Sequence, residues 1–296
     1  MKRTAVVFWS FAVSLLAQSP AAASGEPQAG APKADPVEAI VVSMRKAESA
    51  LTSLRLVMTT RGELPSELVV TTRGTLHVLR GTQPSSHMAL EYTFSDGIRG
   101  RAESASTPEG IVLYENDPAD GEVYLKIENK IVADLAWAGG VLQRADLPGM
   151  ADRRAESPLG SGMLAELRRH YDLKVDARTE RGGEVGSWIV GARKPGLDVQ
   201  DPDLPVGDRV EVFVRAKDHA LLELKELQGQ KVVQQVAVES LELGLDLPAK
   251  VFVVDGRGQR LRDVQQHLPM WEQIEQVLKQ AEAKGGDDVV RPSRRK

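Results

Sequence analysis

The sequence predicts an α+β protein in which a strongly curved antiparallel sheet is covered by a small number of helices. Two observations carry this prediction: strand-like segments outnumber helical ones, and short turn signals separate consecutive strands. The clearest run is Asp208–Val254, where apolar and polar residues alternate with a period of two between turns at Lys217–His219 and Gln228–Gln230. A meander of this kind buries one face, so we expect either helices or a ligand to fill its concave side.

The first predicted helix covers Pro36–Leu54. Asp35 is a favoured N-cap residue and Pro36 a favoured first helical residue. The apolar residues recur at steps of three and four and form one stripe, whereas Arg45, Lys46, Glu48 and Ser49 are expected to face away from it. The stripe either packs on the sheet as core or partly lines a ligand cavity, and the sequence leaves both interpretations open.

Short strand candidates, all separated by turn signals, follow this helix. They cover Leu54–Arg61, Leu68–Arg80, His87–Phe94, Ile98–Ala102, Gly110–Tyr114 and Glu122–Ile127. Gly74 interrupts the second candidate and predicts either a β-bulge or a close approach of another chain segment. Such a run of short strands is typical of a meandering antiparallel sheet.

Helical spacing returns in the middle of the chain and at its end. It predicts helices over Lys130–Arg144 and Ser161–His170, and strands resume at Leu173–Asp176 and Gly186–Gly191. A last helix is expected over Pro269–Lys284, where an apolar stripe is formed by Leu268, Trp271, Ile274 and Leu278. We divide the chain into a signal peptide (1–23), a flexible linker (24–35), one domain (36–265), and a C-terminal helix with a basic tail (266–296).

The N-terminus predicts export. Lys2 and Arg3 precede Ala5–Ala17, an apolar run of signal-peptide length that is too short for a comfortable membrane span. Small residues at 21–23 offer a cleavage site, so we expect a soluble exported protein that does not span the membrane after cleavage. The alternative is a retained N-terminal anchor. Because the chain has no cysteine, we expect neither a disulfide nor a lipid anchor on an N-terminal cysteine.

Composition excludes several classes of function. Loss of Lys2 and Arg3 would change the formal charge from -4 to -6, which argues against a general nucleic-acid-binding protein. Aromatic residues make up 4% of the chain, fewer than a surface for stacking sugars or bases would need. Without cysteine, thiolate catalysis and cysteine-ligated metals are also excluded.

Motifs for catalysis or metal binding are scarce. The five histidines, none with a partner four residues away, are His77, His87, His170, His219 and His267. His77 and His87 lie on adjacent predicted strands and could approach each other, but we expect no metal there. Gly160-Ser161-Gly162 lacks the spacing of a nucleophile elbow, and the acidic loop Asp198–Asp208 lacks the order of a calcium loop. We therefore expect a binding protein without cofactor or metal rather than an enzyme, with an unrecognised hydrolase as the remote alternative.

Arg80 is the one charged residue whose position is unusual. It is in phase with Leu76 and Val78, so its side chain projects to the same face of the strand as theirs. If that face is concave, the cation enters an apolar space and needs a carbonyl or carboxylate partner. The alternative is that strand pairing ends at Leu79 and Arg80 is solvated in the turn.

Several short strings match one family pattern. Gly74–Arg80 (GTLHVLR) follows G-x-L-x-V-x-R, Ser95–Gly97 (SDG) supplies the next turn, and Ala249–Val254 (AKVFVV) is expected to hold the last strand, Val251–Val254. Together with the order of elements, these strings resemble the periplasmic outer-membrane lipoprotein carriers, the LolA-like family. The resemblance extends over about Asp35–Gln265.

The resemblance implies an unclosed β-barrel whose helices form a lid over a hydrophobic cavity for acyl chains of a lipoprotein or lipid. It also implies that Arg80 holds the lid shut. Candidate lining residues, chosen for their phase on the strands or their place on the lid, are Leu76, Val78, Met88, Leu90, Leu135, Trp137, Met163, Val210, Val212, Leu222 and Leu224. We expect a periplasmic carrier of acyl chains. The alternative is an envelope regulatory or scaffold protein that binds a protein partner, which an exposed apolar stripe on the last helix would favour.

Overall fold

The computed structural model describes residues 35–63, 68–117, 121–142, 157–196, 207–285 and 292–294. The predicted signal peptide and nearly all of the predicted linker lie outside these residues. Within the described part of the chain, no helix combines the length and the apolar character that crossing a membrane requires.

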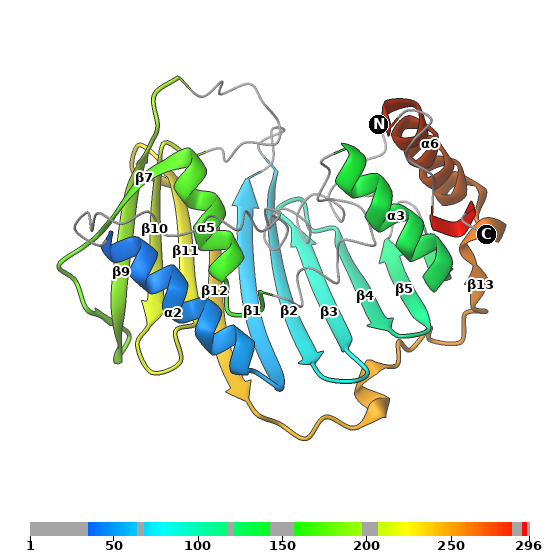
Figure 1. Ribbon diagram of the computed structural model, residues 1–296, viewed down its shortest axis with the longest axis horizontal. Helices are drawn as coiled ribbons and strands as arrows, with labels where there is room; N and C mark the ends of the chain where they lie inside the picture. Colours follow the sequence, from blue (N-terminus) through cyan, green and yellow to red (C-terminus); the bar gives the residue numbers. More distant parts are fainter. Residues whose placement is uncertain are drawn as a thin grey trace.

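A large open sheet forms the body of the molecule (Figure 1). Its strands in chain order are β1 (Ser53–Glu63), β2 (Val69–Leu79), β3 (Ser85–Phe94), β4 (Arg99–Thr107), β5 (Gly110–Asp117), β6 (Gly121–Glu128), β7 (Tyr171–Val175), β8 (Glu180–Arg181), β9 (Glu184–Arg193), β10 (Arg209–Arg215), β11 (Leu221–Gln228), β12 (Lys231–Leu243) and β13 (Arg262–Asp263).

The order of the strands shows that the sheet is not closed. It runs β13-β6-β5-β4-β3-β2-β1-β12-β11-β10-β9-β7, and β8 pairs only with β9. Neighbouring strands are antiparallel except for the short parallel pairing of β13 with β6. Because β13 and β7 remain as two separate edges, the predicted α+β fold with an unclosed barrel is confirmed.

Helices cover this sheet in two groups. The α-helices are α2 (Pro36–Ala50), α3 (Asn129–Leu142), α5 (Ser161–His170) and α6 (Leu268–Gly285), and the 3₁₀ turns are η2 (Ala249–Phe252), η3 (Val264–Gln266) and η4 (Pro292–Arg294). Figure 1 shows α2 and α5 across the half of the sheet that contains β9–β12, whereas α3 and α6 lie at the opposite end, near β5.

The helix α2 begins where the sequence predicts and ends earlier. Asp35 caps it, since its Oδ1 atom accepts a hydrogen bond of 3.0 Å from the amide of Val37. It ends at Ala50 rather than Leu54 because Leu54 already pairs with Val78 in the sheet and is fully buried there.

Two buried clusters hold the helix groups against the same face of the sheet. The first, which we call the α2/α5 cluster, joins Val37, Val41 and Met44 of α2 and Leu164 and Leu167 of α5 to strands β1, β2 and β9–β12. The second, the α3/α6 cluster, joins Ile131, Val132, Leu135, Ala138, Ile274, Leu278 and Ala281 of the two helices to Ile111 on β5 and Leu125 and Ile127 on β6. The hydrophobic core is therefore divided along the concave face.

The C-terminal residues add a polar contact to α3. Asp134 of α3 is buried, and its carboxylate accepts hydrogen bonds from the amide of Ser293, at 2.9 Å, and from its hydroxyl, at 2.7 Å. Thus η4 as well as α6 packs on α3.

The predicted last strand, Val251–Val254, is wrong. Ala249–Phe252 forms the 3₁₀ turn η2, which contacts β3 and β4 outside the sheet. This segment cannot pair with β12, because β1 and β11 already occupy the two sides of β12. Instead, Val254 packs with Ala105 and Tyr114, and its carbonyl accepts a hydrogen bond of 3.0 Å from the Tyr124 hydroxyl.

Gly74 marks a close approach rather than a bulge. Its register with β1 and β3 is continuous, and a Cβ atom placed on it would lie 2.2 Å from Cδ2 of Leu90. The bulge in this region lies in the pairing of β1 with β12, at Val57 and Met58.

Candidate functional site

One row of cross-strand partners connects the two buried clusters. It crosses β1 to β6 and consists of Leu56, Leu76, Met88, Ser104, Leu113 and Leu125. Leu56 and Leu76 belong to the α2/α5 cluster and Leu125 to the α3/α6 cluster. The three residues between them are only partly buried.

The middle of this row is apolar apart from one hydroxyl. Met88 packs against the α2/α5 cluster and Leu113 against the α3/α6 cluster, with Ser104 between them. Leu90 and Ala102, which pair with each other in the adjacent row, are buried. We call these residues, Met88, Leu90, Ala102, Ser104 and Leu113, the central strip. It lies on the concave face between the two helix groups.

The structure brings most of the predicted lining residues into the α2/α5 cluster. Its buried members include Leu76, Val78, Val210, Val212 and Leu224, and Met88 and Met163 pack against it. The lid residues divide: Met163 lies with α5, whereas Leu135 is buried in the α3/α6 cluster and Trp137 packs against that cluster. Leu90 belongs to the central strip.

Leu222 is the exception among these residues. The register of β10 with β11 shifts, so that Phe213 pairs with Glu223 and Val214 with Leu221. Leu222 is the extra residue of this bulge and joins a third buried cluster with Leu159, Trp188, Phe213 and Ala220. The assumption that it shares the surroundings of Leu224 is wrong.

Arg80 reaches the end of α2. Its amide donates a hydrogen bond of 2.8 Å to the carbonyl of Thr52, and its Nη1 atom donates to the main-chain carbonyl of Glu48. A cation near the C-terminal end of a helix is also favoured by the helix dipole. Strand β2 ends at Leu79, as the alternative for Arg80 assumed, but the side chain is half-buried with a carbonyl partner, as the other interpretation predicted.

Glu48 lies on the buried face of α2 and is only 4% exposed. The prediction that it faces away from the sheet is wrong. Its Oε1 atom accepts hydrogen bonds from the Ser157 hydroxyl at 3.1 Å, the Leu159 amide at 3.0 Å and the Ser161 amide at 3.1 Å. Its Oε2 atom accepts from the Ser161 hydroxyl. A buried carboxylate with this many donors is stable where an unpaired one would not be.

A signal for Glu48 was present in the sequence. It follows Val37, Val41 and Met44 at steps of four, three and four, which places it on the buried face of α2. Its type alone suggested an outward position. A glutamate in phase with an apolar stripe is the pattern that should have identified it.

The opposite ends of α2 and α5 are also joined. Arg168 of α5 donates to Asp35 at 2.7 Å and to Glu38, both at the start of α2. These three side chains are between one third and one half exposed, and exposed ion pairs contribute at most about 1 kcal/mol. The buried carboxylate of Glu48 is therefore the stronger of the two connections.

A polar group lies on the opposite face of the sheet. The His77 and His87 rings stack with centroids 5.9 Å apart, and His87 Nε2 lies 2.9 Å from Oε1 of Glu103. Burial, followed by the neighbouring His87 and Arg55, lowers the pKa of His77 below 6.5. Burial alone would raise the pKa of Glu103, but hydrogen bonds from His87 and Arg101 bring it below its usual value.

The predicted approach of His77 and His87 is thus present. Among the residues that the structure describes, no group of three or more histidine, cysteine or acidic side chains is arranged to hold a metal ion. Glu103 is hydrogen-bonded to His87 and Arg101, and His77 stacks on His87.

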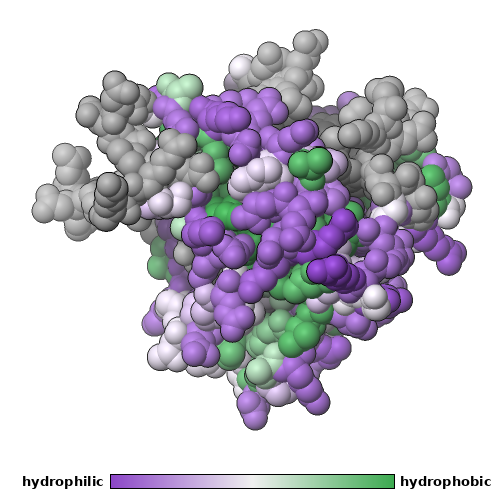
Figure 2. Space-filling model, turned by 90° about the vertical axis from the view of Figure 1, so that its right-hand side faces the viewer, coloured by the Kyte–Doolittle hydropathy of each residue, from purple (hydrophilic) through white to green (hydrophobic). Residues whose placement is uncertain are grey.

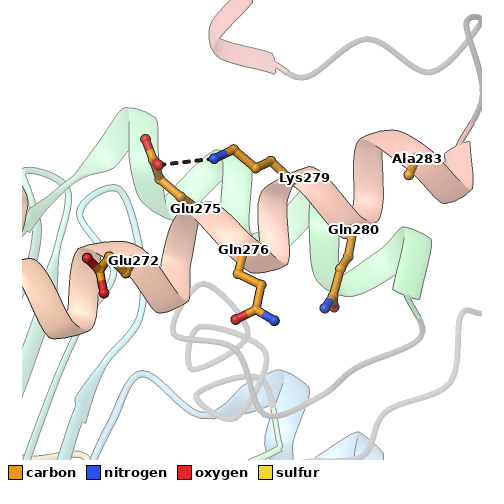
Figure 3. Close-up of a pocket in the computed structure, with 6 residues that line it drawn as sticks. All are labelled: Glu272, Glu275, Gln276, Lys279, Gln280 and Ala283. Atoms are coloured by element: carbon orange, nitrogen blue, oxygen red, sulfur yellow. Dashed lines mark hydrogen bonds and ion pairs between the residues drawn. The ribbon is translucent and has the colours of Figure 1, made fainter.

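An open pocket lies along the polar face of α6 (Figure 3). Its lining residues are Glu272, Glu275, Gln276, Lys279, Gln280 and Ala283. Figure 3 shows Glu275 and Lys279 paired, at 3.4 Å, on the side of the helix away from Gln276 and Gln280. None of the predicted lining residues is here.

The apolar stripe of α6 is mostly covered. Ile274 and Leu278 are buried in the α3/α6 cluster and Trp271 packs against it, whereas Leu268 is 66% exposed. Figure 2 shows this end of the molecule as largely hydrophilic, with hydrophobic residues in small groups. The exposed stripe that would favour a protein-binding scaffold is not formed.

The sequence matches no protein-family model and no curated protein. The structure is similar to an uncharacterized conserved protein from Thermus thermophilus, with a TM-score of 0.36 and 9% identity over 76% of this chain and 98% of that one.

Two further solved structures have more descriptive names. A putative outer membrane lipoprotein-sorting protein domain from Vibrio parahaemolyticus has a TM-score of 0.28 and 11% identity, over 73% of this chain and 95% of that one. A LolA superfamily protein from Nitrosomonas europaea has a TM-score of 0.25 and 9% identity, over 74% and 97%. These are similarities at low identity, and the fold of this chain is established by its own strand order and helix placement.

Proposed function

We propose that this protein is a carrier that binds the acyl chains of a lipid or lipoprotein on the concave face of its sheet. The observation that carries the proposal is the central strip. It is a partly exposed apolar surface that continues directly into the α2/α5 cluster on one side and the α3/α6 cluster on the other. A chain of methylene groups matches such a surface, because it needs burial and offers no hydrogen bonds.

The energetics favour a long apolar ligand. Each methylene group removed from water contributes about 0.8 kcal/mol, and separation of the helices from the sheet takes part of that gain. Ser104 is the polar residue of the central strip, and Glu115 pairs with Ala102 beside it. Because the other four residues of the strip are apolar, affinity would come mainly from chain length. The proposed activity is binding and transfer, without a chemical step.

The proposed place of action is the periplasm. The support is the N-terminal sequence, in which Lys2 and Arg3 precede the apolar run Ala5–Ala17 and small residues at 21–23. The proposed ligands are acyl chains of lipids or lipoproteins from the cell envelope, and nucleic acid is not among the partners.

The proposal is tested by comparing the binding of acyl chains to the wild-type protein and to a variant in which a large side chain fills the central strip. Native mass spectrometry of the exported wild-type protein should show a bound mass of acyl-chain size, and the delipidated protein should take up a fluorescent fatty acid. Ser104→Trp places an indole between Met88 and Leu113 and should abolish most of the uptake. Glu91→Trp, on the exposed opposite face of β3, is the matched control and should retain it.

Two results would contradict the proposal. A wild-type protein that carries no lipid and takes up no fatty acid is not an acyl carrier. A Ser104→Trp protein that folds and binds as the wild type does would show that the central strip is not the binding site.

The proposed latch at Arg80 has its own test. Arg80→Leu removes the hydrogen bond to the Glu48 carbonyl and should accelerate release of the bound fatty acid to vesicles. Unchanged release kinetics would remove the latch role from Arg80.

A further inference from the structure

We infer that the carboxylate of Glu48 makes α2 and α5 a single lid, so that the contact between Arg80 and α2 also controls α5. Glu48 is thus a positioning residue, which acts through the two helices and not on a ligand. The inference rests on the proposed function, because that function requires the helices to open. The coupling itself is a property of the lipid-free protein.

The geometry at Glu48 is a three-way junction. Its main-chain carbonyl accepts from Arg80, at the end of β2, while its carboxylate accepts from Leu159 and Ser161, at the start of α5. The same residue therefore contacts the end of strand β2 through its backbone and the second helix through its side chain. A movement of α2 away from Arg80 displaces the carboxylate to which α5 is attached.

The loop before α5 is shaped around this carboxylate. Gly160 has a φ of +94°, a conformation that favours glycine, and a Cβ atom there would lie 2.8 Å from Cβ of Leu221. The Ser157 hydroxyl donates to the Glu48 carboxylate and accepts a hydrogen bond of 2.7 Å from the Gly162 amide. Amides at a helix N-terminus bind anions, and here the anion is supplied by α2 itself.

The second link, through Arg168, cannot replace this one. Its partners Asp35 and Glu38 are 48% and 44% exposed, so solvent and salt screen the attraction. Glu48 is buried, and hydrogen bonds to a buried charge are about twice as strong as those between neutral groups. Removal of the Glu48 carboxylate should therefore separate the motions of the two helices, whereas removal of Arg168 should not.

The experiment measures distances between labels in the lipid-free protein. The chain has no cysteine, so pairs of introduced cysteines can carry spin labels without background. Exposed positions are Arg45 on α2, Arg169 on α5 and Glu91 on β3 as the reference on the sheet. Arg80→Leu opens the junction without lipid, and the measurement is made with Glu48, with Glu48→Ala and with Glu48→Gln.

With Glu48 present, Arg80→Leu should raise the ratio of the open population to the closed population about tenfold or more. This should be seen in the label distances from the sheet to α2 and from the sheet to α5. The distance between α2 and α5 should stay unchanged. With Glu48→Ala, Arg80→Leu should still move α2 but should add no displacement of α5. Glu48→Gln keeps one acceptor oxygen but loses the charge, so its coupling should lie between those of Glu48 and Glu48→Ala. If the alanine variant does not fold, full coupling in the glutamine variant would argue against the role of the carboxylate. Ser49→Ala, whose hydroxyl bonds only within α2 to Lys46, is the matched control.

Three results would overturn the inference. The first is movement of α2 alone in the presence of Glu48, and the second is equal movement of α5 with and without its carboxylate. The third is no movement of either helix on Arg80→Leu, because the junction would then not hold the lid. Because no lipid is added, these outcomes can be interpreted even if the protein proves not to carry acyl chains.

Discussion

Gly74→Ala tests whether the packing of β2 on β3 is as close as the structure shows. The new Cβ atom would lie 2.2 Å from Cδ2 of Leu90 and 3.3 Å from the carbonyl oxygen of Ala89, so Leu90 must move. Forcing an extra carbon into a filled site costs about 1–3 kcal/mol, and replacing glycine within a strand returns about 0.5–1 kcal/mol. We expect a net loss of about 1–2 kcal/mol in the free energy of unfolding, measured by urea denaturation.

The control for this prediction is Gly140→Ala in α3. No atom lies within 4 Å of a Cβ built on Gly140, so alanine should stabilise the helix by up to about 1 kcal/mol. Leu90 lies in the central strip, so Gly74→Ala should also weaken fatty-acid uptake, whereas Gly140→Ala should not. If both variants are stabilised equally, the close approach of Gly74 and Leu90 is refuted.

Three smaller changes test other contacts. Tyr124→Phe removes the hydrogen bond to the carbonyl of Val254 and should cost about 0.5–1.5 kcal/mol, measured by the urea midpoint; an unchanged midpoint would show that this bond contributes nothing. Burial lowers the pKa of His77, so the folded state favours its neutral form, and stability should fall as the pH drops below 6.5. His77→Phe should make the decline of the urea midpoint between pH 7 and pH 5 shallower, and an unchanged slope would contradict that assignment. Ser293→Ala removes one hydrogen bond to the buried Asp134 and should hasten proteolysis of the C-terminal residues; cleavage at the wild-type rate would argue against docking on α3.

Local signals predicted the helices well. Helix α5 occupies Ser161–His170 as expected, and α2 begins at the Asp35 cap. These features depend on residues close in sequence, such as a capping side chain and an apolar stripe, which a single chain segment determines.

The candidate site was predicted only in part, because it depends on register between strands. Alternation identified the inward faces of β2 and β3, but Leu76, Met88 and Leu113 form one row only through pairings across four strands. The bulge that separates Leu222 from Leu224 has no sequence signal of its own in this segment. Likewise, Val251–Val254 has strand-like composition, and only the filled positions beside β12 exclude it from the sheet.

The width of the central strip across the strands would set a length scale for the proposed ligand. Neighbouring strands lie about 4.8 Å apart, so the two steps from Met88 on β3 to Leu113 on β5 span about 10 Å. Half of a bilayer hydrocarbon core is about 15 Å, which is the depth that one acyl chain occupies in a membrane leaflet, so a chain of that length would extend past the strip. A ligand that lies at right angles to the strands would therefore span a length proportional to the number of strands that it crosses. A longer chain would have to enter one of the helix-covered clusters, so the number of strands between the two helix groups would set the chain length that binds without further opening.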